Sequence, residues 1–200
     1  DPKARLSVTA LFATGTSFTS GWHNSGVGTG DLAKSWAMKQ LYIAAVPVKG
    51  VELSFGSIGF VRGESTEITS YDNDGYIAGE RVSVKRPKSF YFDELAVTSA
   101  YLGDTTKPAF WDRADGLSES RNYFQYFASK KLTKSVAASA EYTRYAGVPT
   151  VRTGIGVKTP KARVVDALKY EQYFRGGSKS DNGFAIYGEK NITKKINAGF

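Results

Sequence analysis

Hydrophobic and polar residues alternate with a period of two along most of the chain. In the segment 151–158, Val151, Ile155 and Val157 fall on one side, while Arg152, Lys158 and two glycines fall on the other. The segments 81–86 and 134–142 alternate in the same way, and helical periodicity is nearly absent. Because successive side chains of a strand point to opposite faces, this pattern predicts β-strands with one apolar and one polar face.

The alternation, with the turn residues that interrupt it, predicts eleven strands. Their expected ranges are 4–14, 34–47, 51–62, 76–86, 90–102, 120–131, 134–145, 150–159, 162–175, 183–190 and 194–200. Most of these ranges exceed the mean of about five or six residues for strands of soluble proteins. Their length suits tilted membrane-spanning strands, which need about 9 to 11 residues.

Short and long connections alternate along the chain. The short ones are expected at 48–50, 87–89, 132–133, 159–161 and 191–193, and the long ones at 15–33, 63–75, 103–119 and 176–182. A short link at 147–149 departs from the rule, because it lies on the long-loop side. Every other short link has lysine in it or beside it. The pattern predicts an up-and-down antiparallel sheet with long loops at one end and a basic rim at the other.

Aromatic residues add a second indication, because they gather toward strand ends. Those expected near the long loops are Tyr71, Tyr76, Tyr101, Tyr123, Tyr142, Tyr145, Tyr173 and Phe174, and a second group, Phe90, Tyr91 and Phe92, lies beside a short turn. Two groups at different heights are typical of the aromatic girdles of membrane barrels. The general preference of aromatic residues for strands is the alternative explanation.

Composition narrows the classes of protein without choosing one. The 200 residues include no cysteine, which excludes disulfide bonds and thiolate metal sites. No apolar run approaches the roughly 20 residues of a membrane helix, a test that membrane strands do not have to meet. A formal net charge of +8 favours anionic partners. We expect one β-barrel domain over residues 1–200.

Three segments together have the strand, acidic loop and strand order common in outer-membrane barrels: 57–62, 71–76 and 79–81. With the architecture above, they make the chain resemble the porin-like outer-membrane β-barrel superfamily, including its anion-selective and polysaccharide-export branches. The resemblance implies an all-β, antiparallel up-and-down transmembrane β-barrel of about 11–12 strands in the bacterial outer membrane. It also implies contact with outer-membrane lipid and lipopolysaccharide, and either homo-oligomers or a partner protein.

An odd number of strands conflicts with the even number usual in single-chain bacterial barrels. The first residues, 1–5, resemble 159–163, so the chain begins within a short-turn motif, and Phe200 ends a strand that points away from the short-turn side. Two explanations stay open: one strand is miscounted, or the chain is part of a larger barrel.

No motif predicts catalysis, a metal or a cofactor. The segment 72–75 has the acidic residues and glycine of a calcium loop, but Arg81 falls where the loop needs a glutamate. Segments 72–75 and 180–183 are therefore expected to be turns, and the glycine-rich segment 26–30 a loop. His23 is the only histidine, so a histidine cluster is excluded. The carboxylates Glu80, Glu94, Glu141, Asp166 and Glu171 are better explained as salt-bridge partners inside a barrel than as glycosidase residues.

Charged residues on the polar faces are the candidate functional residues. The candidate pore-lining residues are Arg62, Arg81, Lys85, Arg152, Lys158, Lys169, Glu171 and Arg175. Rows of fixed cations facing water favour the passage of anions. The leading hypothesis is a channel for anionic solutes or polysaccharide. The alternatives are a structural barrel that binds a partner through its loops or basic rim, and a soluble carbohydrate-binding β-sandwich. Nucleic acid is not an expected partner.

Overall fold

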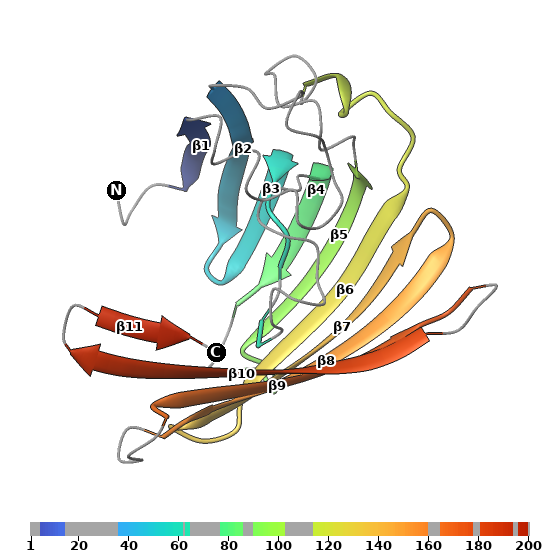
Figure 1. The fold of residues 1–200 in the computed structure, drawn as a ribbon. Coiled ribbons are helices and arrows are strands. Elements are labelled where there is room, and N and C mark those ends of the chain that lie inside the picture. The colour runs from blue at the N-terminus through green and yellow to red at the C-terminus, as the bar shows by residue number, and fades with distance from the viewer. Residues whose placement is uncertain are drawn as a thin grey trace. The chain divides into compact units, whose positions relative to one another are not determined.

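The computed structural model describes residues 5–14, 36–61, 63–64, 77–85, 90–102, 114–159, 165–177, 181–193 and 196–199. These residues form an all-β antiparallel sheet in which eleven strands follow one another in chain order (Figure 1). The strands are β1 (Leu6–Thr14), β2 (Trp36–Val48), β3 (Val51–Ile58), β4 (Ile77–Val84), β5 (Glu94–Leu102), β6 (Tyr123–Lys131), β7 (Val136–Tyr145), β8 (Val148–Lys158), β9 (Ala167–Arg175), β10 (Asp181–Thr193) and β11 (Ile196–Gly199).

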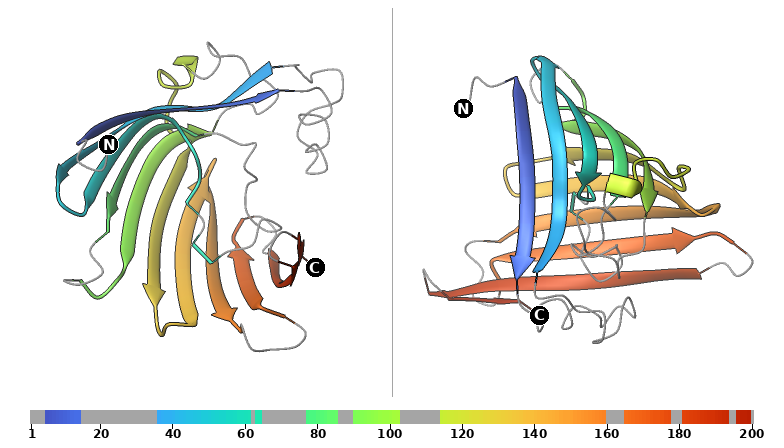
Figure 2. Two further views of the ribbon diagram at one scale, coloured as in Figure 1. Left: turned by 90° about the vertical axis from the view of Figure 1, so that its left-hand side faces the viewer. Right: turned by 90° about the horizontal axis from the view of Figure 1, so that it is seen from above.

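The eleven predicted strands and their up-and-down order are confirmed, with corrections at the ends. Residues 90–93 bend instead of extending β5, and the predicted short links 147–149 and 191–193 lie partly or wholly inside β8 and β10. Asp181 and Asn182, expected in a turn, begin β10. The views in Figure 2 show that each strand runs back alongside the strand before it.

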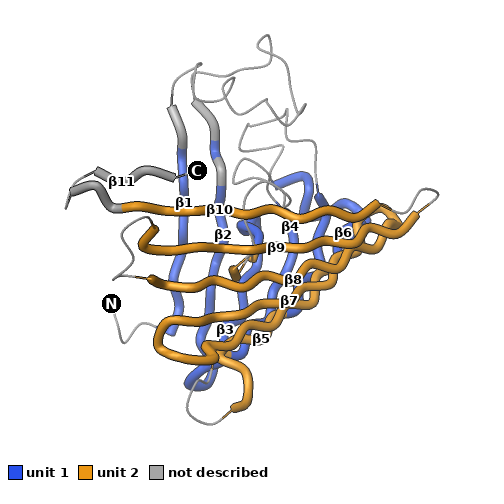
Figure 3. The backbone as a smooth tube through the Cα atoms, turned by 60° about the horizontal axis from the view of Figure 1, so that its bottom comes forward, with its two compact units in different colours: residues 1–60, 71–84, 97–124 blue, residues 61–70, 85–96, 125–200 orange. Residues whose placement is uncertain are grey.

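The chain divides into two compact units, coloured in Figure 3. Unit 1 comprises residues 1–60, 71–84 and 97–124, and unit 2 comprises residues 61–70, 85–96 and 125–200. Neither unit is continuous in sequence. Residues 61–70, which lie between β3 and β4, belong to unit 2, whereas β3 and β4 belong to unit 1.

In unit 1, the strand register places apolar side chains in rows on one face. Val8 lies opposite Ile43, and Ile43 lies opposite Phe55 on the next strand. All three side chains are exposed, as is Leu53, which lies opposite the exposed Val82. The opposite face carries Ala44, Ser54 and Arg81 in register. Unit 1 therefore exposes an apolar face, while its other face combines small and polar residues with the buried apolar side chains of Met38, Ile58 and Ile77.

In unit 2, the exposed face is likewise apolar, and the buried face is more uniformly polar. A row of directly paired residues, Ile155, Tyr170 and Ile186, crosses β8, β9 and β10, and all three side chains are exposed. The rings of Tyr170 and Phe184 stack on this face with their centroids 6.3 Å apart. The exposed apolar residues of unit 2 on its strands are Tyr126, Tyr142, Val148, Val151, Ile155, Leu168, Tyr170, Phe174, Phe184 and Ile186.

A two-residue turn joins β7 to β8. Ala146 and Gly147 have φ angles of 47° and 86°, and Tyr145 pairs with Val148 across the hairpin end. Two successive residues with positive φ match the right-handed twist of the flanking strands, which is why such turns favour short hairpins. Pro149, the second residue of β8, lies next to this turn and pairs with Arg144.

Within the described residues the sheet is open, because β1 and β11 stand at its two ends and each pairs with one neighbour. The barrel closure expected from the sequence is therefore not part of the described structure. Among the same residues, no helix is both long and apolar enough to cross a membrane.

Candidate functional site

The polar face of unit 2 concentrates buried polar side chains. Alternation along β7 and β8 sends Ser139, Glu141 and Arg152 to the face opposite the exposed apolar residues, and all three are buried. Glu141 lies directly opposite Arg152, and Glu171 on β9 lies opposite Gly154. Two carboxylates therefore approach one guanidinium from the strands on either side of β8.

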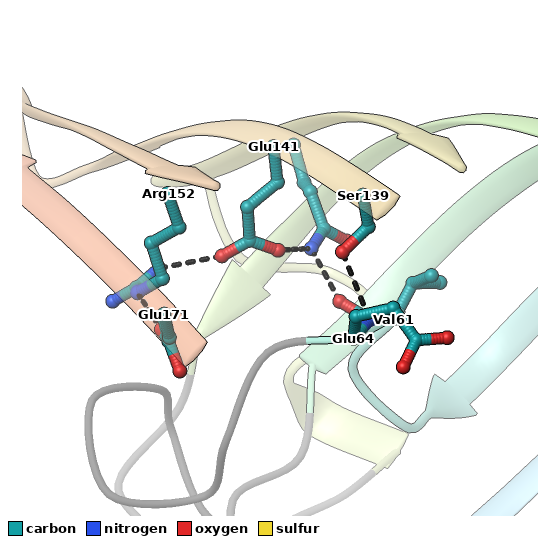
Figure 4. A network of polar contacts seen from close by, with 7 residues as sticks. Val61, Glu64, Ser139, Glu141, Arg152 and Glu171 are labelled. Carbon is teal, nitrogen blue, oxygen red and sulfur yellow. Dashed lines mark hydrogen bonds and ion pairs between the residues drawn. The ribbon is translucent and has the colours of Figure 1, made fainter. Parts of the chain in front are cut away.

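The charge cluster formed by Glu141, Arg152 and Glu171 is shown in Figure 4. Arg152 Nη1 donates a hydrogen bond to Glu141 Oε1 at 2.6 Å, and Arg152 Nε lies 3.8 Å from Glu171 Oε1. The Arg152 residue is 3% exposed and Glu171 is 0% exposed. Because charges this deeply buried must be paired to persist, the cluster fixes the spacing of three strands.

Gln125 on β6 extends the charge cluster toward a segment outside the strands. Its Nε2 donates to Glu141 Oε2 and to the carbonyl oxygen of Val61, both at 2.8 Å. Three residues further along the chain, the amide of Glu64 donates to Ser139 Oγ at 2.8 Å. Figure 4 shows both links, so residues 61 and 64 are held against the polar face by two side chains of unit 2.

Two glycines allow this close approach. Gly63 has a φ of +57°, and a Cβ atom there would lie 2.6 Å from the Cβ of Ser139. A Cβ atom on Gly156 would lie within 2.1 Å of Glu64 Oε2, so the carboxylate of Glu64 rests directly above the backbone of β8. The described part of the β3–β4 link thus covers the polar face at the level of Ser139 and Gly156.

The other candidate residues of unit 2 share the same face but are more accessible. Lys169 pairs with Gly156, and Arg175 pairs with Thr150; both lysine and arginine lie on the polar face. Lys169 is partly exposed, while Lys158 and Arg175 are exposed. The register places Lys169, Glu171 and Arg175 on one face of β9, as expected for residues of a polar face, and Tyr173 shares this face.

In unit 1, Arg81 occupies the polar face of β4. Its Nε donates to Thr98 Oγ1 at 3.0 Å, and its Nη2 donates to the carbonyl oxygen of Gly59. These bonds tie the guanidinium to β5 and to the residue after β3. Arg81 is therefore held by the fold, and its polar-face location agrees with the sequence pattern.

The remaining candidates do not join these groups. Lys85 follows β4 and pairs with Glu94 at 3.6 Å, with both side chains partly accessible. Arg62 lies outside the described residues, as do His23, the segment 26–30, the segment 72–75 and Phe200. Among the described residues, no group of three or more histidine, aspartate or glutamate side chains is arranged to hold a metal ion.

Sequence reasoning missed four contributors: Gln125, Ser139, the carbonyl group of Val61 and the amide group of Glu64. Gln125 and Ser139 were available as polar residues on the polar faces of alternating strands. No local signal marked the contacts of Val61 and Glu64, because their partners lie 64 and 75 positions further along the chain. Glu141 and Glu171 were recognised as salt-bridge partners, and this role is confirmed.

No family model, curated protein or solved structure matches this chain. The charge cluster contains one cation and two carboxylates, and it offers no nucleophile with a neighbouring base. Such a group can orient strands and set the local electric field.

Proposed function

We propose that this chain is an outer-membrane β-barrel protein, complete or part of a larger barrel, whose polar face lines a passage for anionic solutes. The observation that carries the proposal is the inverted burial along β8 and β9 of unit 2. Large apolar side chains such as Ile155, at 45% exposure, face outward, while Arg152 and Glu171 are buried on the other face. A sheet in water places its apolar face against a core. A sheet in lipid does the opposite.

The strand lengths support the same placement. The strands β5 to β9 each have nine to eleven residues. This range matches the about 9 to 11 residues that a tilted strand needs to cross a bilayer. Backbone groups of neighbouring strands are paired, as hydrocarbon requires.

Transport of anions is supported by the accessible cations of the polar face. Arg152 is held between two carboxylates, so its charge is compensated locally. Lys158, Lys169 and Arg175 are more accessible and lie on the same face of β8 and β9. Fixed cations beside water raise the local concentration of anions. We therefore assign selectivity to these three residues in preference to Arg152.

The structural barrel is the second candidate, favoured by Gly63 and Glu64. They lie against the polar face and fill space above Ser139 and Gly156. A polar face filled by the chain itself would hold a barrel shut, and the same protein would then act through its loops or its basic rim.

Single-channel recording in a planar bilayer tests the proposal. The wild-type protein should conduct, with a reversal potential that favours anions. The double variant K169E/R175E should shift the reversal potential toward cations. As the matched control, R144E makes the same kind of charge change at an exposed position opposite Pro149, on the other face of β7. It should leave selectivity unchanged. Absence of conductance would favour the structural barrel, and conductance with unaltered selectivity would exclude the proposed role of Lys169 and Arg175.

A further inference from the structure

An exposed group of aromatic and basic residues lies at one end of unit 2. We call it the aromatic–basic edge, and it consists of Phe90, Tyr91, Lys130, Lys131, Leu132 and Lys134. Tyr91 is 74% exposed, and Phe90 and Leu132 are also exposed. These residues come from the bend before β5, the end of β6 and the turn into β7.

Specific contacts fix the shape of this edge. The amide of Asp93 donates to the carbonyl oxygen of Ser129 at 3.0 Å, and the amide of Lys131 donates to Asp93 Oδ2. The ring of Tyr91 meets that of Phe92 edge to face, with centroids 5.0 Å apart. Thr133 Oγ1 accepts hydrogen bonds from the amides of Ser135 and Val136 in the adjacent turn. The aromatic rings are therefore presented on a braced framework.

The edge lies where the apolar face of β6 ends. Strand alternation places Tyr126, Ala128 and Lys130 on one side, and Tyr126 belongs to the exposed apolar face. Lys130 is the first charged residue of that row, and its Nζ lies 5.2 Å from the centroid of the Tyr91 ring. Amphipathic rings beside lysines suit the boundary between hydrocarbon and headgroups.

The lysines of the edge differ from other lysines of unit 2 in their partners. Lys190 lies 2.9 Å from Asp166, and Lys85 lies 3.6 Å from Glu94. Within the described residues, no carboxylate forms an ion pair with Lys130, Lys131 or Lys134, and the last two are exposed. Among the described residues, these three lysines therefore lack a carboxylate ion-pair partner and share the edge with three exposed apolar side chains.

We infer that the aromatic–basic edge binds the headgroups of anionic lipids, with Tyr91, Phe90 and Leu132 in the interface and the lysines on the lipid phosphates. The inference rests on the membrane placement proposed above and names a partner for this part of the molecule. Charge complementarity selects an anionic lipid surface, because each lysine near such a surface strengthens binding roughly fivefold while a neutral surface offers no such gain.

Urea titration of the full chain in lipid vesicles tests this inference. One set of vesicles contains phosphatidylcholine, and the other contains phosphatidylcholine mixed with phosphatidylglycerol. For the wild type, the anionic lipid should raise the folding equilibrium constant roughly ten- to thirtyfold through Lys130 and Lys134. The variant K130Q/K134Q should lose most of this gain. High salt should also reduce the gain, because it screens surface charges.

The double variant K85Q/K190Q is the matched control. It removes two positive charges from the same unit, but both charges already have carboxylate partners. It should therefore keep most of the gain. If the wild type folds in both vesicles with equal stability, or if both double variants lose the gain equally, the lipid-binding edge is refuted while the membrane placement stands. If the wild type inserts into neither vesicle, the membrane placement fails, and the inference fails with it.

Discussion

At the scale of single residues, Arg152 of unit 2 is a buried cation held by two carboxylates. Its guanidinium is buried between Glu141 and Glu171, and Glu141 also accepts a hydrogen bond from Gln125. Removing the cation leaves two buried carboxylates without their counter-charge. The protein would lose stability mainly because the carboxylates stay buried without a partner, and less because the attraction within the pair is lost.

We expect R152M to lower the free energy of unfolding by about 3–5 kcal/mol, as for other buried pairs that lose one partner. The matched control is R121M in unit 1, because Arg121 pairs with Glu80 at 3.0 Å but both side chains are partly exposed. Exposed pairs contribute about 0–1 kcal/mol. Urea unfolding in detergent micelles measures both variants. Equal losses would show that the charge cluster has no special role in stability.

Residue alternation made part of this site predictable. The polar-face positions of Arg152, Lys169 and Glu171 follow directly from a period of two, and the register confirms them. The pairing of Arg152 with both glutamates did not follow, because it depends on which strands are neighbours and on how they are aligned. A shift of one residue in register would have moved Glu141 to the opposite face.

At the scale of elements, hairpin ends were predicted less accurately than strands. The segment 147–149 suggested a turn because glycine and proline interrupt strands, but the turn lies at Ala146 and Gly147. Pro149 is accommodated in β8 beside the turn. The alternation of Val151, Ile155 and Val157 located the body of β8 correctly, since many positions support a strand while two or three decide its end.

The β7–β8 turn offers a test at this scale. Ala146 has a φ of 47°, a conformation that alanine adopts with difficulty and asparagine more readily. Asn followed by glycine is also the preferred pair for a two-residue hairpin turn. We expect A146N to raise the free energy of unfolding by about 0.5–1 kcal/mol, within the cost assigned to a left-handed alanine.

The control for this turn is A140N, which introduces the same side chain at an exposed position inside β7. Asparagine disfavours strands, so A140N should not stabilise the protein. Urea unfolding under one set of conditions compares the two variants. A destabilising effect of A146N would mean that the turn needs the small side chain more than the backbone preference.

At the scale of the whole molecule, the number and order of the strands were predictable, whereas closure and function were not. Short links indicated which strands form hairpins, and the alternation of short and long links indicated the up-and-down order. Closure depends on how the first and last strands are paired, and neither β1 nor β11 carries a local pattern that specifies a partner. The contacts of Val61 with Gln125 and of Glu64 with Ser139 have the same character, because they join distant parts of the chain.

The exposed apolar face of the molecule contacts either lipid or water. Lysine substitutions at two different depths of this face distinguish the two surroundings. Ile155 lies in the interior of β8, in the row with Tyr170 and Ile186, whereas Leu168 is the second residue of β9. In a bilayer, I155K should lower the free energy of unfolding by about 2–4 kcal/mol and L168K by about 0–1 kcal/mol, because the penalty for lysine falls toward the interface.

Urea titration in phosphatidylcholine vesicles measures the stability of both variants. In water the order has no reason to hold, since both side chains are already exposed. If I155K proves as stable as L168K, and both variants remain folded and monomeric without detergent, the apolar face is not in contact with lipid.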